Sequence, residues 1–292
     1  MLELVPAFDL TAEMLPMIRE GMGAMEPEPP REGVAIEELR TEGPLDVALR
    51  VFQPITDGES KRGCILWIHG GGFLIGNRSM DDPLLNTWVH ELGCVVVSVE
   101  YRLAPEHPYP APLEDCYEAL SWVIEHKGEL NVDPSRIGIG GLSAGGGLAA
   151  ALAILNRDRD EHFVAFQLLE CPMLDHRQIT PSSQADWLAI WSRSSNAFGW
   201  ASYLGELSGS GEIPGTASPA RCEDLSGLPP ALIKVGSIDG FHDEDVAYAT
   251  RLNQAGVPAE LHVYPGVPHG MTVDTTTSVG QQATRDAVSY TH

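Results

Sequence analysis

A serine stands at the centre of the stretch that most constrains the fold of this chain. Residues 141–145 read Gly-Leu-Ser-Ala-Gly, after the strand-like run 136–140 and before the apolar helix former 148–153. The pattern therefore predicts strand, tight turn and helix, with Ser143 at the turn. There a hydroxyl is exposed beside free backbone N–H groups, which favour negative charge. We interpret the turn as a nucleophile elbow; glycine-rich turns before helices also bind phosphate or serve only as turns.

A second glycine-rich turn lies upstream of the first. Residues 69–73 read His-Gly-Gly-Gly-Phe and follow the apolar run 64–68. Successive glycines leave backbone N–H groups unshielded, so that a substrate oxygen can approach them closely. Acyl transfer needs such donors because its tetrahedral intermediate concentrates negative charge on one oxygen, and losing one donor costs roughly 3–4 kcal/mol. The alternative is a flexible loop, but the order of the two turns favours a hydrolase.

An acid and a histidine follow downstream, each after a predicted strand. Asp239 comes after the strand expected near 230–235, and His269 comes after the strand expected near 258–264. Open α/β sheets place their sites at the carboxyl ends of strands. The order of Ser143, Asp239 and His269 is that of nucleophile, acid and base in the α/β-hydrolase architecture.

Together these stretches resemble the bacterial esterases of the hormone-sensitive-lipase family, within the α/β-hydrolase superfamily. The resemblance implies Ser143 as nucleophile, His269 as base and Asp239 as the acid that orients the base, with Asp243 as second choice for the acid. The stretches that carry it follow one another in the expected order: HGGGF at 69–73, YRLAPE at 101–106, PAPLED at 110–115, GLSAGG at 141–146, SGLPPA at 226–231, DGFHDE at 239–244 and YPGVPHG at 264–270.

The same resemblance implies an oxyanion hole made by the backbone N–H groups of Gly71, Gly72 and Ala144. One position departs from the family, which usually carries an acidic residue directly before the serine, where this chain has Leu142. A leucine cannot hydrogen-bond to the neighbouring glycine loop, so we expect the position of that loop to differ without loss of activity. We assign Leu142 and Phe73 to the substrate pocket.

The activity implied by the resemblance is that of a serine carboxylesterase, which hydrolyses short- to medium-chain acyl esters through an acyl-enzyme intermediate. Its partner would be a small-molecule ester, and it would need no cofactor and no metal. Two alternatives stay open: an amidase, arylformamidase or peptidase with the same triad, and a non-catalytic ligand-binding receptor built on the hydrolase fold. The joint presence of the three triad residue types argues against the receptor.

Apolar strand patterns and helical stripes alternate along the chain. Such alternation predicts an α/β fold, and the resemblance implies the α/β-hydrolase fold: a mostly parallel, twisted, eight-stranded sheet with helices on both faces and a helical cap. We expect strands near 34–40, 45–52, 63–68, 94–100, 136–140, 163–169, 230–235 and 258–264, and helices at 9–25, 113–124, 144–153 and 243–255. The expected division is residues 1–40 for the N-terminal helical part of the cap, 41–176 for the first part of the core, 177–215 for the cap insertion and 216–292 for the second part of the core.

The segment from 177 to 215 departs from the alternation and carries Trp187, Trp191 and Trp200. We expect it to join the N-terminal helix in a lid, with Trp187 and Trp191 facing the substrate pocket. The alternative is that the tryptophans only pack this segment together.

Charge and composition exclude other classes of function. Acidic residues outnumber basic ones by 41 to 18, giving a net charge of −23, which repels nucleic acid and anionic membranes. No apolar run approaches the ~18 residues of a membrane span. The five cysteines and ten histidines show no metal-type spacing, and scattered cysteines indicate reduced thiols. With no signal-like start, we expect a cytoplasmic protein, and the sequence is compatible with a homodimer.

Overall fold

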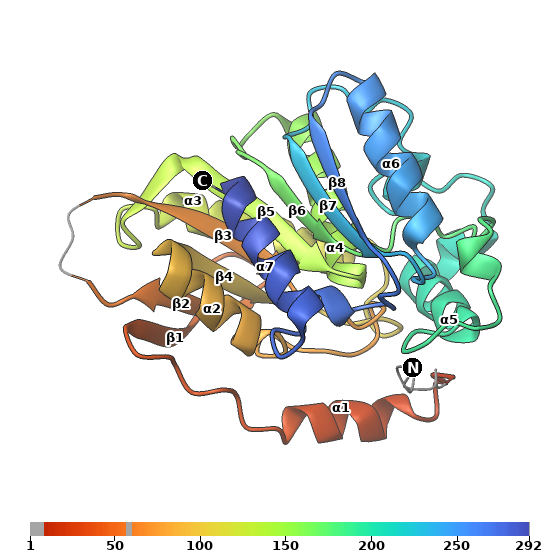
Figure 1. Ribbon diagram of the computed structural model, residues 1–292, viewed down its shortest axis with the longest axis horizontal. Coiled ribbons are helices and arrows are strands. Elements are labelled where there is room, and N and C mark those ends of the chain that lie inside the picture. The colour runs from red at the N-terminus through yellow and green to blue at the C-terminus, as the bar shows by residue number, and fades with distance from the viewer. Residues whose placement is uncertain (1–8, 57–59, 292) are drawn as a thin grey trace.

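A single eight-stranded sheet forms the frame of the protein in its computed structural model, which describes residues 9–56 and 60–291 (Figure 1). The strand order is β1-β2-β4-β3-β5-β6-β7-β8; β1 and β2 are antiparallel to their neighbours, and all the other pairs are parallel. The expected mostly parallel sheet is confirmed. Its strands are β1 (Val34–Arg40), β2 (Ala48–Pro54), β3 (Arg62–Ile68), β4 (Val95–Glu100), β5 (Val132–Leu142), β6 (Gln167–Glu170), β7 (Ala231–Gly236) and β8 (Ala259–Tyr264).

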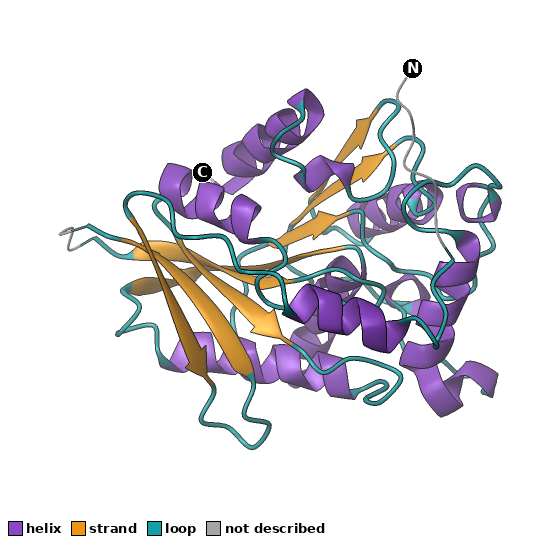
Figure 2. Ribbon diagram, turned by 90° about the horizontal axis from the view of Figure 1, so that it is seen from below, coloured by secondary structure: helices purple, strands orange, loops and turns teal. Residues whose placement is uncertain are grey.

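Helices cover both faces of the twisted sheet, as Figure 2 shows. One face packs against α3, α4 and α6, and the other packs against α2 and α7. The helices are α1 (Leu15–Gly23), α2 (Asp82–Leu92), α3 (Ala111–Glu125), α4 (Ala144–Arg159), α5 (Arg193–Leu204), α6 (His242–Gln254) and α7 (Ser278–Thr291). Short 3₁₀ helices are η1 (Ser182–Gln184), η2 (Gly205–Gly209), η3 (Pro219–Arg221) and η4 (Met271–Val273).

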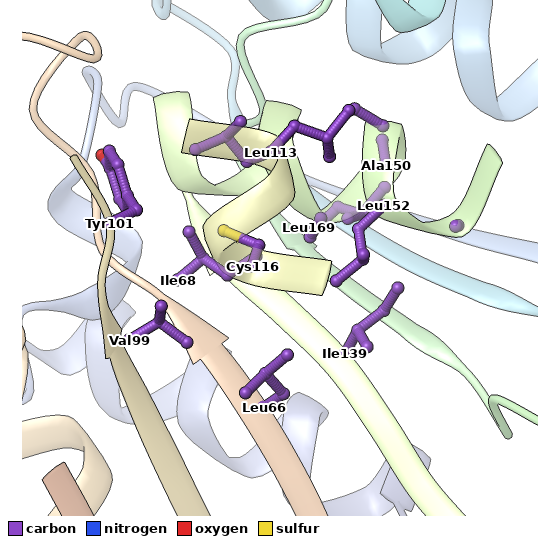
Figure 3. Close-up of a cluster of buried hydrophobic side chains, with 14 of the residues drawn as sticks. Leu66, Ile68, Val99, Tyr101, Leu113, Cys116, Ile139, Ala150, Leu152 and Leu169 are labelled. Atoms are coloured by element: carbon purple, nitrogen blue, oxygen red, sulfur yellow. The ribbon is translucent and has the colours of Figure 1, made fainter. Parts of the chain in front are cut away.

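The central strands are apolar on both faces because helices cover both. On the α3 and α4 face, Leu66 and Ile68 of β3 lie below Leu113 and Cys116 of α3 (Figure 3). All four side chains are at most 1% exposed. Burying an aliphatic side chain of this size contributes about 1.5–3 kcal/mol, which explains why the near-continuous apolar runs become inner strands of a parallel sheet.

The N-terminal helix is shorter than the sequence pattern predicts. We expected a helix over 9–25, but α1 begins at Leu15 and ends at Gly23. Pro16 lies in its first turn, where a fixed φ and a missing N–H are tolerated, so the proline marks the helix start rather than its interior. Helices α2 and α7 lie where no helix was predicted.

Within residues 9–56 and 60–291, the helices are each too short or too polar to cross a lipid bilayer. All five cysteines lie within these ranges, and each is buried and free of a disulfide.

Candidate active site

Ser143 forms the turn between strand β5 and helix α4. Its backbone has φ 56° and ψ −117°, a sparsely populated conformation for a residue with a side chain. Small neighbours permit this turn, since a Cβ on Gly141 would lie 2.4 Å from the backbone of Gly145. A Cβ on Gly145 would lie 2.0 Å from the carbonyl oxygen of Ile68. The two glycines are therefore required by close packing of the elbow.

The side chains of Ser143, His269 and Asp239 form one hydrogen-bonded chain. The Nε2 atom of His269 lies 2.9 Å from Oγ of Ser143, and its Nδ1 atom lies 2.9 Å from Oδ2 of Asp239. The second carboxylate oxygen of Asp239 accepts a 2.9 Å hydrogen bond from the backbone N–H of Phe241. The Phe241 ring also lies edge-on to the imidazole, with centroids 5.0 Å apart. Residues distant in sequence are thus held in a fixed order, with the imidazole in the middle.

The glycine loop runs beside this serine. A Cβ on Gly70 would lie 3.4 Å from Cβ of Ser143, so the loop backbone passes directly over the elbow. Gly71 and Gly72 have φ values of 110° and 61°, which a side chain would disfavour. Ala144 is the first residue of α4, so its N–H has no partner within the helix. All three residues predicted to form the oxyanion hole therefore lie around Ser143 or in the loop beside it.

His69 fixes the start of this loop, as we expected. Its Nδ1 atom lies 2.8 Å from the carbonyl oxygen of Gly70, and its ring stacks on Tyr101 with centroids 4.3 Å apart. The Tyr101 hydroxyl donates to the carbonyl oxygen of His69 at 3.1 Å. Burial lowers the pKa of His69, so this imidazole is held neutral as a structural group.

Comparisons with known proteins agree with this geometry. Residues 65–273 match the family described as the α/β hydrolase fold. The chain belongs to this family. The α/β hydrolase is 35% identical to the esterase LipI of Mycobacterium tuberculosis over 258 residues, which cover 87% of this chain and 80% of that protein. It is 38% identical to the carboxylesterase NlhH of the same organism over 245 residues, covering 80% and 76% of the two chains.

The fold of the hydrolase is also similar to solved structures. The structure of a bacterial heroin esterase superposes with a TM-score of 0.91 at 39% sequence identity, covering 98% of this chain and 93% of that one. The expected resemblance to the hormone-sensitive-lipase family of bacterial esterases is confirmed.

Asp243, our second choice for the acid, points away from the imidazole of the hydrolase. Its Oδ1 atom lies 2.8 Å from Nδ1 of His242, and its Oδ2 atom accepts a 2.8 Å hydrogen bond from the backbone N–H of Ser182. The carboxylate that contacts His269 is that of Asp239. Asp243 instead fastens the segment that contains η1 to the start of α6.

Two further acids of α6 are buried behind the triad, and the sequence gave no reason to single them out. One carboxylate oxygen of Glu244 accepts hydrogen bonds from the backbone N–H groups of Leu174 and Asp175. Asp245 is fully buried, and neither of its oxygens has a partner in the described part of the chain. Burial raises the pKa of both carboxyl groups well above the usual range, and Asp239 adds to the effect.

The four residues that we assigned to the substrate pocket lie in different surroundings. Phe73 is buried and stacks on Tyr203 of α5, with centroids 4.0 Å apart. Leu142 packs into the apolar cluster between the sheet and α2. Trp191 covers Gly72, because a Cβ on that glycine would lie 2.2 Å from the indole ring. Trp187, by contrast, is 54% exposed.

Cys171 lies beside the triad, which dispersed cysteine spacing did not predict. It directly follows β6 with a φ of 35°, and it is 1% exposed. Its Sγ atom, a carboxylate oxygen of Asp239 and a ring nitrogen of His269 all lie within 4.8 Å of one another. Burial, with the charge of Asp239 as a second cause, raises the pKa of the thiol well above its usual value.

Proposed function

We propose that the chain is a serine carboxylesterase that hydrolyses short- to medium-chain acyl esters through an acyl-enzyme intermediate. The expected enzyme class, a carboxylic ester hydrolase, is confirmed by relatives named as esterases and carboxylesterases. The observation that carries the finer proposal is the hydrogen-bonded chain from Ser143 through His269 to Asp239, placed beside the glycine loop.

Acylation begins with attack by the Ser143 oxygen on the ester carbonyl carbon. His269 accepts the hydroxyl proton at Nε2, because that atom already faces Oγ at 2.9 Å. Asp239 keeps the other imidazole proton on Nδ1 and stabilises the imidazolium. The carbonyl oxygen becomes negative as the tetrahedral intermediate forms, and we assign its stabilisation to the N–H groups of Gly71, Gly72 and Ala144. His269 then gives its proton to the leaving alcohol.

Deacylation repeats these steps with water as the nucleophile. His269 takes a proton from the water that attacks the acyl carbon, and the second tetrahedral intermediate uses the same backbone donors. Its collapse returns the proton to Ser143 and releases the carboxylic acid. Each cycle therefore consumes one ester and one water and needs proton transfer alone from the side chains of the triad.

The cap, in our proposal, combines residues 1–40 with the insertion 177–215 and covers a core made of residues 41–176 and 216–292; residues 1–8 and 57–59 and residue 292 lie outside the described residues. The backbone N–H of Leu10 donates to Oγ of Ser195 at 2.8 Å, which joins the two segments. A Cβ on Gly199 of α5 would lie 2.8 Å from the carbonyl oxygen of Gly72, so the insertion rests on the glycine loop. A cap here would limit the length of the acyl chain.

The cytoplasm is the location that we propose for this enzyme. Its five cysteines are buried and free of disulfides, which fits a reducing compartment.

The decisive experiment replaces the nucleophile. In Ser143→Ala we expect kcat for p-nitrophenyl butyrate to fall by roughly a millionfold, with an unchanged circular dichroism spectrum. Ser121→Ala, on α3, is the matched control and should keep its activity. An aryl phosphonate should label the wild type once per chain and leave Ser143→Ala unlabelled.

Other outcomes would redirect the proposal. An active Ser143→Ala enzyme would exclude the mechanism. A folded wild type that neither turns over esters nor reacts with the phosphonate would favour a binding receptor. Faster cleavage of an anilide than of the ester with the same acyl group would favour an amidase.

A further inference from the structure

We propose that Cys171, Asp239 and His269 form a binding site for a thiophilic divalent cation such as Zn²⁺ or Cd²⁺, and that an ion bound there inhibits the enzyme. The binding part of this proposal stands on the geometry of the three side chains. The inhibitory part rests on the proposed function, because Asp239 and His269 belong to the triad.

The three potential ligands are close enough to share one ion. Their ligating atoms, one from each side chain, all lie within 4.8 Å of one another. Zinc bonds of about 2.0 Å to nitrogen and oxygen and about 2.3 Å to sulfur place neighbouring ligands roughly 3.3–3.8 Å apart in a tetrahedral site. Side-chain shifts of about 1 Å or less would therefore complete the geometry. A thiolate, an imidazole and a carboxylate are also the donor types that zinc selects.

The surroundings of the cluster favour a positive ion. Asp245 is fully buried, and both of its carboxyl oxygens are without a hydrogen-bond partner among the described residues. It interacts electrostatically with both Cys171 and Asp239. A divalent cation bound by one thiolate and one carboxylate forms a neutral unit, which removes the repulsion between these groups. The unpartnered Asp245 is thus a second observation that points to a cation.

Binding would disable the base through its tautomer. The cation takes the lone pair of Nδ1 of His269, so the proton that sat on Nδ1 is carried by Nε2 instead. The Cys171 thiol releases its proton to water and binds as thiolate. Nε2, which faces Oγ of Ser143 at 2.9 Å, is then a donor and cannot accept the serine proton. No oxidation or reduction takes place, and one proton is released for each ion bound.

The chemistry of the site also sets its selectivity and rate. Calcium and magnesium prefer sets of oxygen ligands, so they should not compete at a thiolate–imidazole site. Cys171, Asp239 and His269 are 1%, 2% and 7% exposed, respectively. Because every ligand is buried, the ion must enter through local opening of the protein, and inhibition should develop with time.

The test uses the full-length enzyme with Cd²⁺, whose bond to a thiolate gives an ultraviolet charge-transfer absorption. Absorption and the rate of ester hydrolysis are recorded after incubation with Cd²⁺ or, as control ion, Ca²⁺. The variants are Cys171→Ala and Cys171→Ser, with Cys116→Ala as the matched control because Cys116 is another buried thiol, on α3. Each rate is referred to that variant's own metal-free rate, and folding is checked by circular dichroism.

We expect Cd²⁺ to give a saturable absorption and a time-dependent loss of activity in the wild type and in Cys116→Ala, both reversed by a chelator. In the folded Cys171 variants the absorption should disappear, and the Cd²⁺ concentration for half-inhibition should rise at least about tenfold. Equal inhibition of a Cys171 variant and the wild type, or no saturable absorption in the wild type, would overturn the site. An absorption that depends on Cys171 in a protein inactive on esters would retain the site and remove the proposed function instead.

Discussion

The backbone N–H of Ser143 donates a 2.8 Å hydrogen bond to the carbonyl oxygen of Glu170, which joins the elbow to strand β6. The Glu170 carboxylate forms an ion pair with Lys234 of β7, and both side chains are 1% exposed. It also accepts a 3.2 Å hydrogen bond from the hydroxyl of Thr272, three residues after His269. A buried ion pair therefore connects the strand that supports the nucleophile to the loop that carries the base.

Replacing one partner of this pair should destabilise the protein strongly. In Lys234→Met the Glu170 charge would be left buried without its cation, and we expect the free energy of unfolding to fall by about 3–5 kcal/mol. The measurement is urea denaturation followed by tryptophan fluorescence. The double variant Glu170→Gln/Lys234→Met removes both charges and should recover part of the loss. A Lys234→Met protein as stable as the wild type would show that the pair contributes little.

The two candidate acids can be separated by isosteric substitutions. Asp239→Asn should lower kcat by about 10⁴-fold, because an amide no longer holds the proton of His269 on Nδ1. Asp243→Asn, its matched control on the same turn, should keep kcat within about tenfold, since Asp243 contacts His242 and Ser182 instead. Steady-state kinetics on p-nitrophenyl butyrate measures both. The reverse ranking would assign the acid to Asp243.

Local patterns explain why much of the fold could be predicted. The strands of a covered parallel sheet appear as apolar runs, so β1, β3, β4, β7 and β8 lie within two residues of their expected bounds. Helix α2 escaped detection for a reason that its own sequence contains. Polar residues such as Asn86 and Thr87 interrupt its apolar stripe, although both are buried in the folded chain. Their burial depends on tertiary contacts that periodicity does not report.

The candidate site divides along the same line. Ser143, Asp239 and His269 stand in motifs whose residue types and order are visible in the sequence, and the structure brings them together. Cys171 and Lys234 stand in no such motif. They reach the site because β6 and β7 are neighbours in the sheet, and strand order cannot be read from local composition.

Trp191, rather than Trp187, should control acyl-chain preference. The Trp191 ring covers Gly72 of the glycine loop, whereas Trp187 is 54% exposed. Trp191→Ala should raise kcat/KM for p-nitrophenyl octanoate relative to the butyrate by about tenfold, because it opens space beside the reacting carbonyl. Trp187→Ala is the control and should leave the ratio unchanged. An unchanged ratio in Trp191→Ala, together with lower stability, would mean that Trp191 only packs the insertion.

Asp81 should make the stability of the protein depend on pH. This carboxylate accepts a 2.7 Å hydrogen bond from the indole N–H of Trp67, and burial raises its pKa from 3.8 to about 6. The folded state therefore binds the proton more tightly than the unfolded state. Between these two values the unfolded chain ionises first, so stability falls as the pH rises. At 1.36 kcal/mol per pKa unit, the full cost above pH 6 is about 3 kcal/mol.

Asp81→Asn removes this titration while its amide oxygen can still accept from Trp67. Relative to the wild type, the variant should therefore gain about 3 kcal/mol of unfolding free energy between about pH 4 and about pH 7, measured by urea denaturation at each pH. Asp224→Asn is the control of opposite sign, because hydrogen bonds from Ser226 lower the pKa of that exposed carboxyl, and its removal should cost stability as the pH rises. A difference between Asp81→Asn and the wild type that stays constant with pH would mean that the Asp81 carboxyl ionises equally easily in the folded and unfolded chains, and that its contact with Trp67 offsets the cost of burial.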